Sequence, residues 1–193
     1  MKRISITFLL CASLAIVGCK NDKKDNDAEK ASETEMNQDT SKEEVKKVTL
    51  TIDPKSGSNL TGNAVFTQEN GEVTMTAVID GLAEGMHAIH IHENADCSAE
   101  DGSSAGGHWN PTFEKHGKWG NPEGYHKGDI GNFKVDANGN GTVTMTTDEW
   151  CIGCEDETKN ILGKSVVIHD GVDDFTSQPS GNAGTRVGCG TIK

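Results

Sequence analysis

The stretch Met86-His87-Ala88-Ile89-His90-Ile91-His92 decides the fold of this chain. Successive side chains of a β-strand point to opposite faces, so a strand here places the rings of His90 and His92 on one face and Ile91 on the other. His87 has the opposite parity, and we interpret it as a structural residue that hydrogen-bonds neighbouring backbone behind the ligands. Two imidazoles on one rigid strand are preorganised to bind the same metal ion.

Histidine is confined to one part of the chain around this strand. All seven histidines lie between residues 87 and 169, and the first 86 residues contain none. Neutral imidazole is the commonest protein ligand for copper and zinc. Scattered surface histidines are the alternative, but chance placement would not leave so long a segment empty. The pattern therefore predicts a metal site that draws on His90, His92, His108, His116, His126 and His169, with Asp129 three residues after His126.

The rest of this region carries repeated β-strand signals and no long stretch of helical periodicity. The strands are expected at residues 48–52, 64–67, 73–79, 87–92, 130–135, 142–147, 165–169 and 186–192. Turn sequences separate neighbouring strands at Glu69-Asn70-Gly71 and at residues 137–141. These patterns predict an all-β fold, an eight-stranded antiparallel Greek-key barrel or sandwich whose long loops carry metal ligands.

Two further motifs follow the histidine strand. They are Gly106-Gly107-His108-Trp109-Asn110-Pro111 and Gly181-Asn182-Ala183-Gly184-Thr185-Arg186-Val187-Gly188-Cys189-Gly190. Together with Gly85–His92, and over residues 48–193, they resemble the copper/zinc superoxide dismutase family, in its bacterial lipoprotein form. The resemblance implies an enzyme that disproportionates superoxide to dioxygen and hydrogen peroxide.

The resemblance also implies two sets of metal ligands that share one histidine. The copper ligands would be His90, His92, His108 and His169. The zinc ligands would be His108, His116, His126 and Asp129. Four nitrogens suit a tetragonal Cu(II), whereas three nitrogens and one carboxylate suit tetrahedral Zn(II). His108 would bridge both cations, which requires a ring deprotonated at both nitrogens.

The resemblance implies catalytic roles for His108 and Arg186. Arg186 is the only arginine after residue 3, and a fixed guanidinium beside copper attracts a small anion and hydrogen-bonds its oxygens. Asp173 would accept hydrogen bonds from the outer nitrogens of one copper ligand and one zinc ligand at once, which fixes both rings. Asp174 is the neighbouring alternative for this role.

Four cysteines in residues 48–193 suit disulfides in an oxidising compartment. By resemblance, Cys97 and Cys189 form a disulfide that ties the loop carrying the bridging histidine to the last strand. The other two belong to Trp150-Cys151-Ile152-Gly153-Cys154. A local disulfide is the favoured interpretation of this pair. A thioredoxin-like dithiol and a thiolate copper site are the alternatives, although no helix is expected after the motif.

The N-terminal region reads as a bacterial lipoprotein signal. Residues 1–18 hold two cations followed by an apolar run, and Cys19 follows at its end, so we expect cleavage there and lipidation of Cys19. Ordinary secretion with cleavage elsewhere is the alternative. From Cys19 to residue 47 the chain is charged and almost free of large apolar residues, which predicts a disordered tether. The expected product is a membrane-anchored extracytoplasmic lipoprotein, in the periplasm or on the cell surface.

Charge bears on the partners of the predicted domain. Residues 48–193 carry nine Lys or Arg against twenty-one Asp or Glu, which argues against nucleic-acid binding. The same excess repels an anionic substrate, so attraction must come from Arg186, from the metals, or from Lys118, Lys127 or Lys134. The alternative function is a non-catalytic copper/zinc-binding envelope protein. The family dimerises through different faces, so the resemblance allows a homodimer without indicating its interface.

Overall fold

The computed structural model describes residues 44–193. The expected signal peptide, Cys19 and nearly all of the tether lie outside the described residues. The strands are β1 (Lys46–Pro54), β2 (Thr61–Glu69), β3 (Glu72–Asp80), β4 (Gly85–His92), β5 (Gly131–Val135), β6 (Gly141–Thr147), β7 (Ser165–His169) and β8 (Arg186–Thr191), with one short 3₁₀ helix, η1 (Ser103–Ala105). The described part contains no helix of the length and apolarity needed to span a bilayer.

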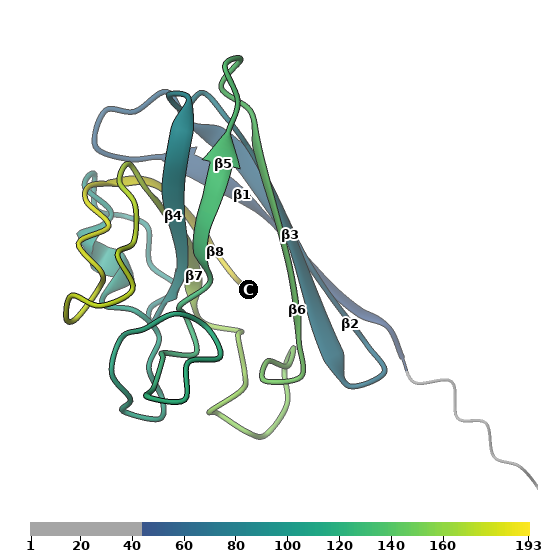
Figure 1. The fold of residues 1–193 in the computed structure, drawn as a ribbon. Helices are drawn as coiled ribbons and strands as arrows, with labels where there is room; N and C mark the ends of the chain where they lie inside the picture. Colours follow the sequence, from purple (N-terminus) through teal and green to yellow (C-terminus); the bar gives the residue numbers. More distant parts are fainter. Residues whose placement is uncertain (1–43) are drawn as a thin grey trace, which may run out of the picture. The chain divides into compact units, whose positions relative to one another are not determined.

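The strands form a closed antiparallel barrel in the order β1-β2-β3-β6-β5-β4-β7-β8. This confirms the predicted all-β, eight-stranded antiparallel fold. The chain crosses the barrel twice, because β3 is paired with β6 and β4 with β7. The second pairing sets His90 opposite Val167 and His92 opposite Ser165, so the histidine-rich end of β4 lies beside the first residues of β7. Figure 1 shows the long β4–β5 and β7–β8 loops on the side of the barrel formed by β4.

Both predicted turn sequences connect paired strands. Asn70 and Gly71 have φ values of 52° and 81°, the left-handed pair that a tight hairpin between β2 and β3 requires. Gly139, with φ of 89°, serves the turn between β5 and β6. The largest difference from the expected strands is at β2, which begins at Thr61, three residues before the expected start, while β1 begins at Lys46, two residues early. The pairing of β1 with β2 continues to Lys46, which explains the extension of β1.

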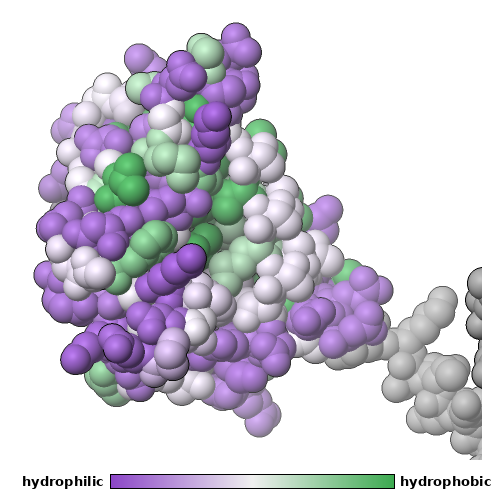
Figure 2. Space-filling view, viewed as in Figure 1, coloured by the Kyte–Doolittle hydropathy of each residue, from purple (hydrophilic) through white to green (hydrophobic). Residues whose placement is uncertain are grey.

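Every second side chain of β3 enters the barrel core. Val73, Met75, Ala77 and Ile79 of β3 are fully buried, while the threonines between them reach the surface and pair with those of β6, as in Thr74 Oγ1 to Thr146 Oγ1 at 2.9 Å. The face in Figure 2 is accordingly mostly hydrophilic, with a paler area over the side of β3 and β6. β4 is an exception, since residues from His87 onward are buried on both faces. The long loops cover its outer face, where the histidines lie.

Two disulfides are present among the described residues. Cys97 in the β4–β5 loop is joined to Cys189 in β8, 92 residues away. Cys151 and Cys154 form a local disulfide, the favoured interpretation of this pair. Disulfides persist in oxidising compartments, so the two bonds indicate an extracytoplasmic protein.

We expect the two disulfides to contribute unequally to stability. In the chain-entropy model, loss of the 92-residue bridge lowers the free energy of unfolding by about 4 to 5 kcal/mol and loss of the three-residue bridge by about 2 kcal/mol. Urea unfolding of metal-free C97S/C189S and C151S/C154S proteins measures both. Equal losses would show that native contacts, and not loop closure, determine the contribution of the longer bridge.

Candidate metal centre

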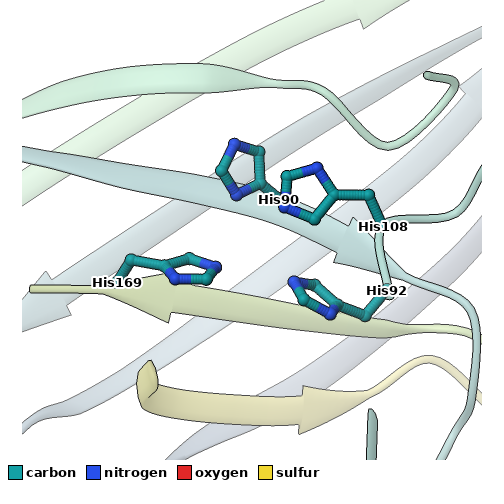
Figure 3. Close-up of side chains that lie close together, drawn as sticks. All are labelled: His90, His92, His108 and His169. Carbon is teal, nitrogen blue, oxygen red and sulfur yellow. The ribbon is translucent and has the colours of Figure 1, made fainter. Parts of the chain in front are cut away.

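Strands β4 and β7 place three histidines on the outer face of the barrel. His90 and His92 alternate with Ile89 and Ile91, which enter the core, and His169 ends β7 beside them. Figure 3 shows these rings and the ring of His108 turned toward a common centre. The parity expected from the sequence is therefore present in the strand.

His108 joins this group from the long β4–β5 loop. An isolated antiparallel bridge pairs it with His92 at the end of β4, and the neighbouring Trp109 N–H donates to the Ile91 carbonyl at 2.8 Å. Its ring centroid lies 3.9 Å from that of His90. Backbone pairing thus holds this loop residue as firmly as the strand residues.

Each of the four rings points one nitrogen that has no protein partner toward the other three rings. These buried atoms are His90 Nδ1, His92 Nε2, His108 Nε2 and His169 Nε2, and the ligand atoms of the group lie within 4.8 Å of one another. The opposite nitrogens of His92 and His169 face the carbonyl oxygens of Gly106 at 2.9 Å and Gly184 at 3.3 Å. Because carbonyls only accept, these outer nitrogens carry the protons and the inner nitrogens keep free lone pairs. Four such donors fit a copper ion.

A second group lies immediately beside the first and shares His108 with it. It contains His108, His116, His126 and Asp129, all buried. The Nδ1 atoms of His116 and His126 lie 3.0 Å and 3.3 Å from the Asp129 carboxylate but form no hydrogen bond with it. Three nitrogens and one carboxylate converging in this way fit a tetrahedral zinc ion.

Close backbone packing brings Asp129 to this position. The preceding residue, Gly128, accepts from Ile91 N–H at 2.9 Å and donates to the Trp109 carbonyl at 3.0 Å. A Cβ atom at Gly128 would overlap the Ile91 carbonyl oxygen, so only glycine fits between β4 and the loop. Asp129 Oδ2 then accepts from the backbone N–H groups of His126 at 2.8 Å and Gly117 at 3.1 Å, which fixes the carboxylate.

Asp173 connects the two groups behind the rings. Its Oδ2 lies 2.9 Å from His90 Nε2 and its Oδ1 lies 2.9 Å from His116 Nε2, all buried. Asp174 instead accepts from the backbone of Thr176 and Ser177 at the surface. The geometry therefore places Asp173, and not its neighbour, against one histidine of each group.

His87 lies outside both groups, as its parity indicates. The buried ring faces two backbone carbonyls, with Nε2 at 2.9 Å from Ala83 O and Nδ1 at 3.2 Å from His169 O. It contacts the backbone of a residue whose side chain belongs to the first group. Its place is thus behind the site.

Two amide side chains that the sequence did not indicate hold parts of the site. Gln178 accepts from His116 N–H and donates to the His116 carbonyl, both at 2.9 Å. Asn132 accepts from Asp173 N–H at 2.8 Å and donates to the Asp173 carbonyl at 2.9 Å. The partners are 62 and 41 residues apart, so no local spacing signals either pair.

Individual histidines of the site differ in proton affinity in the metal-free protein. Burial lowers the pKa of His169 to about 3 and that of His108 to about 4, with neighbouring imidazoles acting in the same direction. Burial also opposes charge on His116, but the adjacent carboxylates of Asp129 and Asp173 outweigh it and raise the pKa of His116 to about 9. The histidine contacts of Asp129 likewise overcome burial and hold its pKa well below the usual range. His108 and His169 are thus neutral near pH 7, whereas His116 holds a proton where a cation would bind.

A pocket of about 440 Å³ opens onto the first group. His92, His108 and His169 line it together with Arg186 and Glu114. Arg186 Nη1 donates to the Gly102 carbonyl at 2.8 Å, which fixes the guanidinium at the mouth, and burial lowers its pKa. Among the described residues that line the pocket, Arg186 is the only lysine or arginine. A small anion entering here meets one fixed cation beside the histidines.

Known proteins resemble this chain in sequence and in structure. A superoxide dismutase (Cu-Zn) 1 of Aquifex aeolicus is 39% identical over 137 residues, which are 68% of this chain and 79% of that protein. The superoxide dismutase (Cu-Zn) of Haemophilus parainfluenzae is 31% identical over 151 residues, 74% of this chain and 78% of that protein. Among solved structures, the crystal structure of the clock protein EA4 superposes with a TM-score of 0.66 at 31% identity and covers 76% of this chain and 92% of that one.

The family profile described as copper/zinc superoxide dismutase (SODC) matches residues 60–192. This range contains both histidine groups, Asp173 and Arg186. The profile, the relatives and the geometry of the two groups agree: the chain belongs to the copper/zinc superoxide dismutase family.

Proposed function

We propose that this superoxide dismutase works at the two histidine groups, with each residue in a specific role. Copper would be held by His90, His92, His108 and His169, and zinc by His108, His116, His126 and Asp129. One observation carries the proposal. Four buried imidazole nitrogens without a protein partner, His108 Nε2 among them, converge on one point, and the other nitrogen of His108 faces the second group. Buried polar atoms normally have a partner, and a metal ion would supply one to all four nitrogens.

The protein's own residues would control binding and proton delivery. Bound copper supplies the electron chemistry, oxidising one superoxide to dioxygen and reducing another to hydrogen peroxide. His108 Nδ1 lies 2.8 Å from Asp129 Oδ1, which keeps that side of the ring in the second group. His108 Nε2 is therefore the atom that can take up a proton and deliver it to the departing peroxide beside it.

Arg186 would bind and orient the substrate. Superoxide is a small anion, and a guanidinium presents several N–H donors in a fixed plane. The fixed position of Arg186 at the pocket mouth supports this role, because the acidic domain offers little other attraction. The non-catalytic alternative would leave Arg186 without a function, whereas all proposed copper ligands and Arg186 are present together.

We also propose the organisation of the whole chain. Residues 1–18 would be a signal peptide, Cys19 a lipidated N-terminus, residues 19–47 a tether, and residues 48–193 the enzymatic domain. The apolar run that ends at Cys19 supports the anchor, and the two disulfides support an extracytoplasmic position. The enzyme would then act while tethered to a membrane of the cell envelope. A homodimer is compatible with this arrangement, but we assign it no interface.

Metal loading tests the proposed function directly. We expect one copper and one zinc per chain and fast superoxide dismutation after loading with both ions. His108→Ala removes a ligand from both groups and should lower the affinity for each metal by more than about a hundredfold. Loss of an outer hydrogen-bond partner alone lowers metal affinity about ten- to a hundredfold. Metal analysis and pulse radiolysis measure both quantities. A variant that kept both metals and full activity would exclude the shared role of His108, and tight metal binding without turnover would favour the non-catalytic alternative.

Replacing Arg186 should slow the enzyme without removing its metals. We expect Arg186→Ala to lower the rate about tenfold at low ionic strength, because a cation at the pocket mouth raises the local concentration of an anion. The loss should shrink at high salt, where charges are screened. Lys47→Ala removes the same charge from an exposed position on β1 and serves as the control. If both variants lost the same rate, net charge and not the pocket would be responsible.

Metal uptake should release protons unequally from the metal-free protein. The pKa of His116 is raised to about 9, so near pH 8 its ring holds a proton that zinc must displace, and we expect about one proton released per zinc. Copper alone should release fewer, because burial lowers the pKa values of His92, His108 and His169 and leaves these rings neutral. Calorimetry in buffers of different ionisation enthalpy measures the proton count. Equal release for the two ions would contradict the proposed ligand sets.

A further inference from the structure

The segment just before the Cys151–Cys154 disulfide contacts the loop that carries His116, His126 and Asp129. Glu149 accepts hydrogen bonds from the Tyr125 hydroxyl at 2.5 Å and from Lys127 Nζ. Trp150 Nε1 donates to the Lys127 carbonyl at 2.8 Å. Two adjacent residues thus hold the positions on either side of His126.

Aromatic packing strengthens the same contact. Trp150 is 1% exposed, and the ring of Trp119 meets it edge-on at a centroid distance of 5.6 Å. Trp119 in turn packs against Tyr125 at 5.0 Å. The loop therefore rests on Trp150 through apolar as well as polar contacts.

Trp150 is itself fixed by the residues that follow it. Cys151 N–H donates to the Lys159 carbonyl at 2.8 Å and the Cys151 carbonyl accepts from Ile161 N–H at 3.0 Å. Ile152 N–H donates to Gln68 Oε1 in β2 at 2.7 Å. The disulfide closes this short irregular segment, which lies between β6 and β7 and has no regular strand partner.

We propose that Glu149 and Trp150 are positioning residues for the zinc site and that the Cys151–Cys154 disulfide keeps them in place. Zinc affinity is then set in part by this disulfide. The inference rests on the zinc ligand set of the proposed function. Outer contacts that orient ligands typically change metal affinity by about ten- to a hundredfold.

The contact should act on zinc more than on copper. Three of the proposed copper ligands, His90, His92 and His169, belong to strands whose pairing does not involve residues 149–154. All four proposed zinc ligands come from the irregular β4–β5 loop, and Glu149 and Trp150 contact this loop on either side of His126. A loop held by side chains loses its geometry when those side chains move, whereas a paired strand does not.

Reduction of the disulfide would then weaken zinc binding. A dithiol reductant attacks the half-buried Cys154 sulfur as a thiolate, and the buried Cys151 leaves as a thiolate that takes up a proton. The second thiol of the reductant displaces Cys154 and completes its own disulfide. The protein gains two electrons and two protons, and the reductant loses them.

Zinc competition with a chromophoric chelator on the metal-free full-length protein tests the inference without an activity assay. We expect C151S/C154S and Trp150→Phe, which keeps an aromatic side chain but loses the indole N–H donor, each to raise the zinc dissociation constant about tenfold or more. Copper affinity should stay within about twofold in both variants. Co(II) bound in place of zinc should also show altered visible absorption, because its spectrum reports ligand geometry.

Two controls separate positioning from general destabilisation and from a wrong zinc site. Ile79→Val removes a buried methyl group at the end of β3 that pairs with Gly141, far along the strand from the end beside Thr147. This variant should leave zinc affinity unchanged. Asp129→Ala should abolish zinc binding if the proposed zinc site is correct. If Asp129→Ala had no effect, the proposed function would fail at the zinc site. If it abolished binding while both test variants bound zinc like the native protein, this inference alone would be wrong.

Reduction of the Cys151–Cys154 disulfide is measured in a separate experiment. The metal-free protein is equilibrated with oxidised and reduced dithiothreitol, freed thiols are alkylated, and mass spectrometry identifies the labelled cysteines. Labelling of Cys151 and Cys154 while the protein remains folded would support a disulfide open to dithiols. Labelling only after unfolding would overturn the dependence of zinc affinity on redox state.

Discussion

Burial of imidazole rings whose inner nitrogens have no protein partner is the constraint on which this structure depends. In the two groups, six of these ring nitrogens are buried without a hydrogen-bond partner, and each would cost free energy if it stayed so. A metal ion in each proposed set would satisfy several at once, which would couple metal binding to folding of the loops. The barrel supplies the rigid part of this arrangement, because β4 and β7 present three of the histidines from paired strands.

The loops around the barrel are held mainly by side chains bonded to backbone. Gln178 and Asn132 each form two hydrogen bonds with the main chain of a site residue, and Glu93 Oε1 accepts from Gly107 N–H at 3.0 Å beside His108. Such bonds substitute for the ladders that irregular segments lack. The Cys97–Cys189 disulfide adds a covalent tie between the loop of His108 and the strand of Arg186. Geometry at the metals is therefore built from many distant contacts.

The acidic surface gives the pocket a specific electrostatic problem. The whole chain has a formal charge of −12, yet its substrate is an anion. Attraction over long distances is weak or repulsive under these conditions and is further reduced by salt. In the proposed function, Arg186 in the pocket and the bound cations would provide the local attraction. Selection of the anion would therefore depend on short-range contacts in the pocket, which salt screens less than it screens long-range attraction.

Sequence alone determined the features that depend on neighbouring residues. Strand alternation, the Asn70-Gly71 turn and the parity that separates His87 from His90 and His92 all follow from backbone geometry over a few positions. Order of the motifs indicated the family, and family resemblance supplied the ligand sets. Tertiary structure alone decided that Asp173 and not Asp174 faces the histidines, that Gln178 and Asn132 hold the backbone, and that Trp150 supports the loop of His126. These contacts join residues that lie 23 to 83 positions apart, so only closure of the barrel and its loops brings them within hydrogen-bonding distance.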